Sequence, residues 1–223
     1  QQALTILKRL SHDYPDYRWN AEVRYQTANL LYRVGEYKQA IETGQDWLAR
    51  YPDHPLRRHV YILLGDACLE AHEKVEAFRW WLRAKKAWAE DSQTGSQLSS
   101  KIQELIDESD LDLLKRLKEH AKGTEFAPRI TYRMGLIFAE KGETGKAREA
   151  AEWLIRSGGT EDWAAKGKAL LNQVTSQLAF RTDVLGCLLP LSGPYAIYGR
   201  EVLNGIQLGI QGKLAGPGSF EIA

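Results

Sequence analysis

Residues 21–52 read AEVRYQTANLLYRVGEYKQAIETGQDWLARYP, and this stretch decides the fold. Apolar residues recur with a helical period on both sides of Gly35. A glycine between two such periods is a turn signal. The stretch therefore predicts a helix, a tight turn at Gly35 and a second helix.

Six residues make this stretch resemble a tetratricopeptide repeat: Ala28, Gly35, Tyr37, Ala40, Trp47 and Pro52. The small residues at the eighth and twentieth positions, Ala28 and Ala40, let two helices approach closely while larger neighbours interdigitate around them. The resemblance implies an α-solenoid of stacked hairpins, because stacking buries faces that a single hairpin leaves open.

Two later stretches repeat the pattern. One starts at Arg58 and has matching residues at Tyr61, Leu64, Gly65, Cys68, Ala77, Trp81 and Ala84. The other starts at Pro128 and has them at Met134, Gly135, Phe138, Gly142, Ala147, Ala151 and Leu154. A repeat of about 34 residues is the length expected of this class.

Two further units are weaker. Residues 3–15 match only a second helix, so the chain is expected to begin in mid-hairpin, and residues 95–121 form a degenerate repeat with Ser109 where glycine is expected. Glycines at 158–159 end the last unit, and residues 161–179 are expected to form a closing helix. We therefore predict one TPR-like helical repeat domain over residues 1–180, in a mainly α chain.

The pattern changes at Arg181. Residues 183–190, DVLGCLLP, are a short apolar run typical of a parallel strand covered on both faces. A loop at 191–194 leads into a helical segment with an apolar stripe, and residues 219–223 have the character of a second strand. The order strand, helix, strand predicts a βαβ fragment over residues 181–223.

Residues 184–210, VLGCLLPLSGPYAIYGREVLNGIQLGI, are similar to the opening of type I periplasmic binding proteins of the branched-chain amino-acid receptor group, which includes leucine-binding proteins. The resemblance implies that residues 181–223 are a truncated first piece of such a domain. Helical repeats ahead of such a domain are the arrangement found in lipoproteins resembling the penicillin-binding-protein activators of the bacterial envelope.

These resemblances imply a non-enzymatic protein–protein interaction scaffold of the bacterial envelope that takes part in regulating cell-wall synthesis. The alternative is a receptor for an amino acid or another small solute, with a role in transport. The expected localisation is periplasmic or outer-membrane-anchored, with attachment through a lipid anchor that this chain lacks.

Composition narrows the function classes. Lys and Arg number 30 against 29 Asp and Glu, so the formal net charge is +1 and no overall field attracts nucleic acid. No run of 18 apolar residues occurs. No phosphate-binding loop, dinucleotide fingerprint or hydrolase nucleophile motif is present, so neither an enzyme nor a cofactor is predicted.

The first helix of each hairpin is expected to line a concave groove that binds a protein or peptide partner. The residues expected on that wall are Tyr25, Asn29, Tyr32, Arg33, His59, Asp66, Arg129 and Tyr132. Aromatic, amide and charged side chains together suit a peptide or a protein loop. The alternative interpretation is an ordinary solvated groove.

In the C-terminal segment, Ser192 and Tyr198 are the candidate ligand-binding residues for an amino acid or small ligand. Ligands of open α/β sheets collect beyond the carboxyl ends of the strands, and the loop from Ser192 to Tyr198 follows the first predicted strand. The alternative is that Ser192 caps a turn and Tyr198 packs.

The other conspicuous residues are interpreted as structural. Trp80, Trp81 and Trp88 form a stripe expected to pack in the core. Cys68 and Cys187 are expected to be buried thiols without a disulfide between them, and Cys68 with His72 offers only two ligands, so no metal site is predicted. A solvated corner is expected for the acidic cluster Glu104, Asp107, Glu108, Asp110 and Asp112.

Overall fold

The chain divides into two compact units, Gln1–Asn172 and Gln173–Ala223. The computed structural model describes residues 2–14, 17–88, 93–177, 184–185, 187–213 and 221–222. Among these residues, no helix combines the length and the apolar character that crossing a membrane requires.

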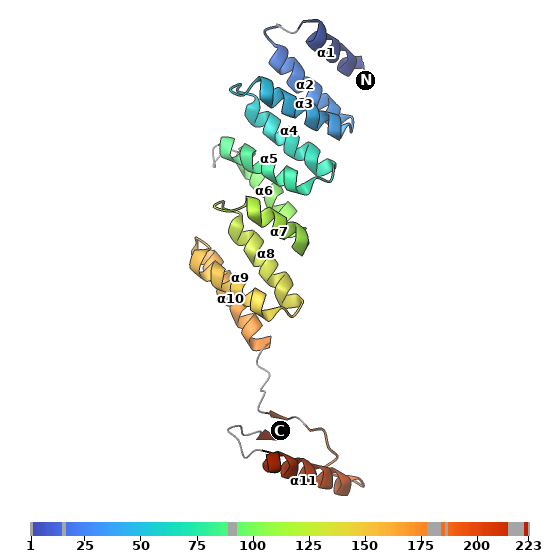
Figure 1. Ribbon diagram of the computed structural model, residues 1–223, viewed down its shortest axis with the longest axis vertical. Helices are drawn as coiled ribbons and strands as arrows, with labels where there is room; N and C mark the ends of the chain where they lie inside the picture. Colours follow the sequence, from blue (N-terminus) through green and yellow to red (C-terminus); the bar gives the residue numbers. More distant parts are fainter. Residues whose placement is uncertain are drawn as a thin grey trace. The chain divides into compact units, whose positions relative to one another are not determined.

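Helices follow one another along the first unit (Figure 1). They are α1 (Gln2–Asp13), α2 (Asn20–Arg33), α3 (Tyr37–Arg50), α4 (Arg57–Glu70), α5 (Lys74–Ala87), α6 (Gln93–Asp107), α7 (Leu111–His120), α8 (Ala127–Glu140), α9 (Thr144–Ser157) and α10 (Glu161–Gln177). The second unit contains β1 (Val184–Leu185), α11 (Ala196–Lys213) and β2 (Glu221–Ile222).

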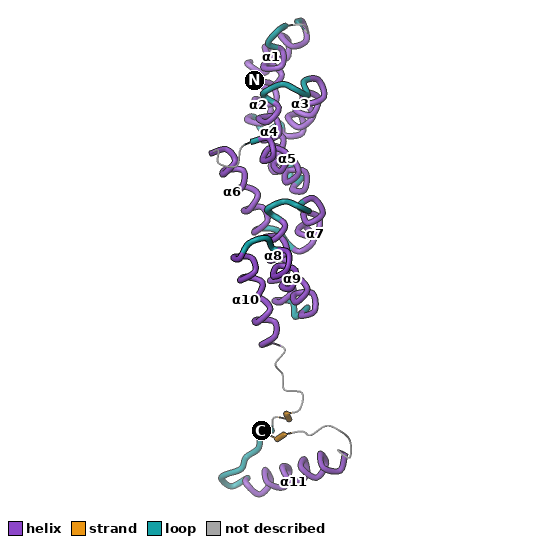
Figure 2. Tube along the Cα trace, turned by 90° about the vertical axis from the view of Figure 1, so that its left-hand side faces the viewer, coloured by secondary structure: helices purple, strands orange, loops and turns teal. Residues whose placement is uncertain are grey.

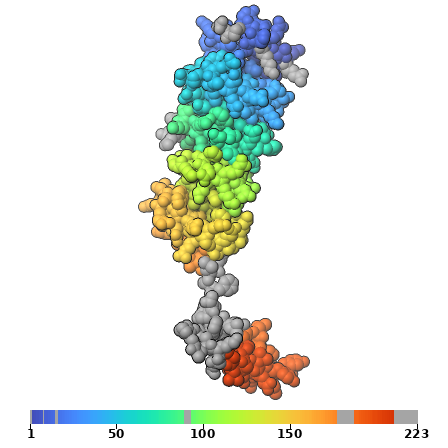
Figure 3. All heavy atoms as spheres, viewed as in Figure 1, coloured from blue at the N-terminus to red at the C-terminus, as the bar shows by residue number. Residues whose placement is uncertain are grey.

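Three helical hairpins form the body of the first unit. α2 packs on α3, α4 on α5, and α8 on α9, and the first two hairpins stack through α3 and α4. The space-filling view shows these elements as successive bands in sequence order (Figure 3). The mainly helical, TPR-like fold predicted from the sequence is thereby confirmed.

Small residues stand where the helices come closest. Ala40, Ala77 and Ala147, at the twentieth position of each hairpin, are all 0% exposed. At the eighth position, a Cβ added to Gly65 would lie 2.3 Å from Cδ1 of Trp81. Close approach at these positions is therefore a property of the packing, as the sequence predicts.

The turns of the three hairpins share one backbone conformation. Gly35, His72 and Gly142 have φ values of 85°, 63° and 72°. In each turn the next residue donates its N–H to the carbonyl oxygen five residues earlier, as from Glu73 to Cys68 at 2.8 Å. This is the double hydrogen bond of the Schellman motif, which places a left-handed residue after the helix. His72 occupies a position that favours glycine.

Replacing His72 with glycine should stabilise the first unit by about 0.5–1 kcal/mol, because a side chain is strained in the left-handed conformation. Urea unfolding followed by circular dichroism measures the change. The reverse substitution at the matching turn, Gly142→His, should destabilise by a similar amount. A loss of stability in His72→Gly would show that the imidazole makes a contact stronger than the strain.

The predicted degenerate repeat over residues 95–121 does not close as a hairpin. α6 and α7 contact each other far less than the helices of the other hairpins, and both pack instead on α5 and α8. Figure 2 shows α6 and α7 on opposite sides of the stack. The physical reason lies at Ser109, which does not take the left-handed conformation and whose hydroxyl donates to the Leu105 carbonyl at 2.6 Å.

The middle of α10 packs on the last hairpin at two glycines, Gly135 and Gly167. A Cβ added to Gly135 would meet Leu170 Cδ2 at 2.6 Å, and one added to Gly167 would meet the Ala151 backbone oxygen at 2.8 Å. The closing helix is therefore present, and it extends to Gln177. The last two residues of the predicted helix, 178–179, lie outside the described residues.

In the second unit, β1 and β2 pair in parallel, Val184 with Glu221 and Leu185 with Ile222. The predicted strand over 183–190 is too long: Cys187 to Pro190 have no regular structure, and Cys187 is half-buried rather than buried. A strand persists only where its backbone has a ladder partner, and the described pairing involves two residues on each side. The periplasmic-binding-protein domain stays a prediction.

Candidate functional site

The groove residues named from the sequence lie on α2, α4 and α8. We call the surface formed by α2, α4, α6 and α8 the A-helix face. Two cavities open along it. Tyr32 and Asp66 line one, and Arg129 and Tyr132 line the other. Asn29 and Arg33 line neither of these two cavities.

The first of these, the acidic cavity, has a volume of about 310 Å³. Its lining comes from α2, α4, α5 and α6 and from the residue after α6: Tyr32, Asp66, Leu69, Glu70, Lys74, Trp81, Lys101, Glu104, Leu105 and Glu108. Because α6 diverges from α7, its own side chains reach this cavity. The sequence does not single out Lys101, and Glu104 and Glu108 are interpreted from it only as part of a solvated acidic corner.

Asp66 holds three helices together at the base of the acidic cavity. Its Oδ1 accepts a hydrogen bond from Trp81 Nε1 at 2.9 Å and an ion-paired one from Lys101 Nζ at 2.7 Å. Trp81 is 1% exposed, so its N–H must find an acceptor inside the protein. Asp66 is therefore a positioning residue that joins α4 to α5 and α6, as well as a groove residue.

The charges around Tyr32 affect its hydroxyl. Burial raises the pKa of Tyr32, and the nearby carboxylates of Asp66 and Glu70 raise it further. The ring of Tyr32 lies 5.8 Å from that of Tyr37, which helps to fix its orientation. The hydroxyl thus stays protonated at neutral pH and is available as a hydrogen-bond donor to a partner.

The second, or basic, cavity has a volume of about 400 Å³. Its lining residues, from α6, α8 and α10, are Asp107, Arg129, Tyr132, Arg133, Leu136, Trp163 and Lys166. The Arg129 guanidinium donates to both carboxylate oxygens of Asp107, with Nε to Oδ1 at 2.9 Å. This hydrogen bond raises the pKa of Arg129. The Tyr132 and Trp163 rings lie 6.0 Å apart.

Tyr25 and His59 meet outside both cavities, with ring centres 6.5 Å apart. His59 also contacts the ring of Trp88 at 5.2 Å, and the Arg58 guanidinium lies 4.3 Å from the centre of that ring. Burial lowers the pKa of His59, and the Arg58 charge lowers it further. His59 is therefore neutral at pH 7 and serves as an aromatic contact.

The tryptophan prediction is correct in two of its three residues. Trp80 and Trp81 are buried in α5. Trp88 follows α5 in an extended conformation and is half-buried, so it is not part of the helical stripe. The helix ends at Ala87, which places the Trp88 ring over Arg58 at the surface.

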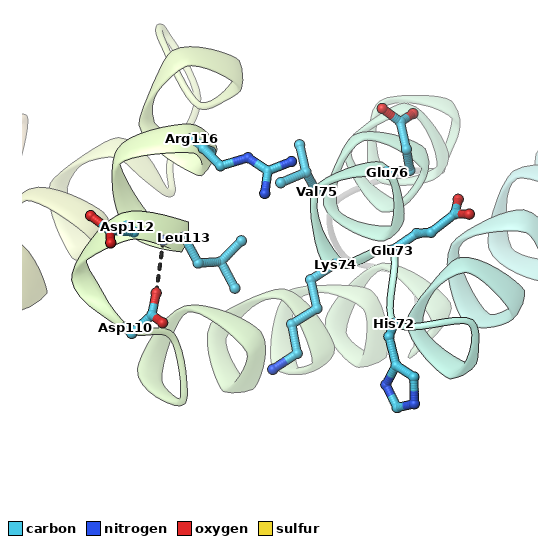
Figure 4. A pocket seen from close by; sticks show the side chains of 9 residues that line it. All are labelled: His72, Glu73, Lys74, Val75, Glu76, Asp110, Asp112, Leu113 and Arg116. Carbon is cyan, nitrogen blue, oxygen red and sulfur yellow. Dashed lines mark hydrogen bonds between the residues drawn. The ribbon is translucent and has the colours of Figure 1, made fainter.

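A third cavity, of about 500 Å³, lies where the turn before α5 faces the start of α7. Figure 4 shows side chains of residues 72–76 on one side and those of Asp110, Asp112, Leu113 and Arg116 on the other. Three of its carboxylates are engaged locally: Glu76 pairs with Arg79, Asp112 with Lys115, and Asp110 caps α7 by accepting from the Leu113 N–H at 2.8 Å. Its polar groups do not converge on a common point, which argues against a ligand site.

Cys68 lies in α4, and His72 lies in the turn that follows this helix. Among the described residues, no group of three or more histidine, cysteine, aspartate or glutamate side chains could hold a metal ion. Cys68 is 1% exposed, and burial, followed by the charges of Glu73 and Glu76, raises the pKa of its thiol to about 12.

In the folded protein, Cys68 should resist iodoacetamide at pH 8, because the reactive thiolate is almost absent and the sulfur is shielded. After unfolding in urea it should be alkylated fully. Mass spectrometry of the tryptic peptide that contains Cys68 measures both states. Rapid alkylation of the folded protein would contradict the burial of this thiol.

Ser192 and Tyr198 are both exposed in the second unit. Ser192 lies in the loop before α11, and Tyr198 lies in the first turn of that helix and is 66% exposed. The exposed ring of Tyr198 therefore differs from the packed arrangement of the alternative interpretation. Their role in ligand binding stays a prediction.

The geometry defines a TPR-like helical-repeat protein with two cavities along its A-helix face. Residues 1–108 match the family model YfiO, described as an outer membrane lipoprotein, and this part is a YfiO-like, TPR-like helical domain. The matched part covers α1 to α6. The family's localisation agrees with the periplasmic or outer-membrane-anchored position expected from the sequence. No curated protein matches the chain.

Proposed function

We propose that the chain is a non-enzymatic scaffold of the bacterial envelope whose A-helix face binds a segment of a partner protein. The observation that carries the proposal is the pair of cavities on this face, each of which has a tyrosine ring, Tyr32 or Tyr132, among charged groups. Aromatic side chains supply rigid contact area, and charged groups at their rim select the partner.

The envelope assignment is supported by the likeness of residues 1–108 to an outer membrane lipoprotein family. We extend it to a role in regulating cell-wall synthesis, on the resemblance of the whole arrangement to penicillin-binding-protein activators. In that role the helical repeats contact the protein partner.

Random peptides displayed on phage and selected on the full chain test the binding face. Replacing both Tyr32 and Tyr132 with alanine should weaken the selected peptides by at least about tenfold, because each aromatic anchor contributes about 1–2 kcal/mol. Tyr14→Ala, an exposed tyrosine that lines neither cavity, is the matched control. Selected peptides that bind the double variant as well as the original chain would refute the proposal.

A second candidate function is a receptor for an amino acid or small solute. It is favoured by the parallel pairing of β1 and β2 on either side of α11, with Ser192 and Tyr198 exposed at the start of that helix. Ligand present at 100 times its dissociation constant should stabilise the binding unit by about 2.7 kcal/mol. A thermal-shift screen of the full-length protein with amino acids tests this, and no shift with any of them would count against the receptor.

A further inference from the structure

The two cavities of the A-helix face differ in the sign of their charge. Four carboxylates and two lysine ammonium groups line the acidic cavity, an excess of two negative charges. Two arginines, one lysine and one carboxylate line the basic cavity, an excess of two positive charges. The net charge of the whole chain is only +1, yet negative and positive charges are concentrated in separate cavities.

In the acidic cavity, the unengaged charge is negative. Lys101 is held by Asp66 at 2.7 Å, and this pair cancels. One ammonium group, that of Lys74, and three carboxylates remain, and the carboxylates are all exposed: Glu70, Glu104 and Glu108. The negative field therefore faces outward, where a cation of the partner meets it.

In the basic cavity, the unengaged charge is positive. Asp107 accepts from Arg129 and cancels it. Arg133 uses its Nε for the Asp107 backbone oxygen at 3.1 Å and keeps its charge. Lys166 pairs with Asp162, but both side chains are largely exposed, so that pair is weak.

The two cavities are close enough for one segment to reach both. Glu104 and Glu108 line the acidic cavity, while Asp107 lines the basic one, so both cavities meet at the C-terminal end of α6. At a helical rise of 1.5 Å per residue, Glu104 and Asp107 are separated by only about 5 Å along the axis. A partner segment of a few residues spans this distance.

We propose that the A-helix face binds a partner segment whose basic and acidic residues are separated into two blocks, with the basic block in the acidic cavity and the acidic block in the basic cavity. This rests on the proposed function and adds the orientation of the bound segment. Tyr32 in the acidic cavity, and Tyr132 with Trp163 in the basic cavity, supply the contact area on which each block lies. The order of the charges along the partner segment then decides in which direction and position the segment binds.

Two fluorescent peptides of identical composition test this with the full chain. The block peptide has two lysines, a tyrosine, a glycine–serine spacer, a tyrosine and two glutamates, and the other peptide has its charges alternating. At low salt, the block peptide should bind about fivefold more tightly, as expected for several exposed charge pairs acting together. The preference should shrink at about 0.5 M salt, where the Debye length is only about 4 Å.

The double variant Glu104→Lys with Glu108→Lys should remove the preference, because it reverses the charge of the acidic cavity. The matched control, Glu42→Lys with Glu149→Lys, makes the same charge change on α3 and α9 and should keep it. Three results would overturn the inference. They are equal binding of the two peptides, a preference for the block peptide that survives in the cavity variant, and no binding of either peptide. If phage-selected peptides still require Tyr32 and Tyr132 after such a result, the proposed function stands and only the inference about charge order is lost.

Discussion

Replacing Trp47 with alanine should destabilise the first unit by about 3–5 kcal/mol, the largest effect expected of any single substitution described above. Trp47 is 0% exposed, and its Nε1 donates to the Ala21 backbone oxygen at 2.6 Å. Its ring also contacts those of Tyr51 and His54 at 5.3 and 5.4 Å. The indole thus joins α3 to α2 and to the connection that leads into α4.

Urea unfolding followed by far-UV circular dichroism measures this loss. Trp19→Ala is the matched control, because Trp19 is 46% exposed and should change stability by less than about 1 kcal/mol. Trp47→Phe keeps most of the ring but removes the donor, and should cost about 1–2 kcal/mol. If Trp47→Ala were no more harmful than Trp19→Ala, the packing described for α2 and α3 would be wrong.

Gly65→Ala should destabilise by about 1–3 kcal/mol although it adds a single methyl group and alanine is the better helix former. The added Cβ would lie 2.3 Å from Cδ1 and 2.4 Å from Nε1 of Trp81. Trp81 cannot move away easily, because it is 1% exposed and its indole N–H is held by Asp66. The substitution therefore strains α4 against α5 and disturbs the acidic cavity.

The control for Gly65→Ala is Gly145→Ala, in the first turn of α9. A Cβ at Gly145 meets nothing within 4 Å, so the better helix propensity of alanine should appear as a gain of up to about 1 kcal/mol. Opposite signs for the two glycines, measured by the same urea titration, are the expected result. A neutral Gly65→Ala would show that α4 and α5 are not packed as closely as the structure has them.

Sequence periodicity was sufficient for the regular hairpins, because their geometry depends on a few residues with special backbone or size requirements. Gly35 and Gly142 mark left-handed turns, and Ala40, Ala77 and Ala147 mark close approach. His72 is in the same conformation without being glycine. The spacing of the repeat predicts a turn near residue 72, whereas a histidine by itself does not indicate one.

The candidate site was harder to predict than the fold. Four of the predicted first-helix residues line cavities, and their positions follow from the repeat frame: Tyr32, Asp66, Arg129 and Tyr132. The partners that complete the cavities come from the irregular parts: Lys101 and Glu104 from the diverging α6, and Trp163 from α10. Periodicity along one helix carries no information on such contacts between non-equivalent helices.

Two-dimensional NMR of the ¹⁵N-labelled chain tests most directly whether the A-helix face is the binding surface, because it maps where a phage-selected peptide binds. If the A-helix face binds the partner segment, the shifted amide signals should gather on α2, α4, α6 and α8, around Tyr32 and Tyr132. The signals of α3 and α9 should stay unchanged. Shifts confined to α3 and α9, with the A-helix face unaffected, would contradict this proposal.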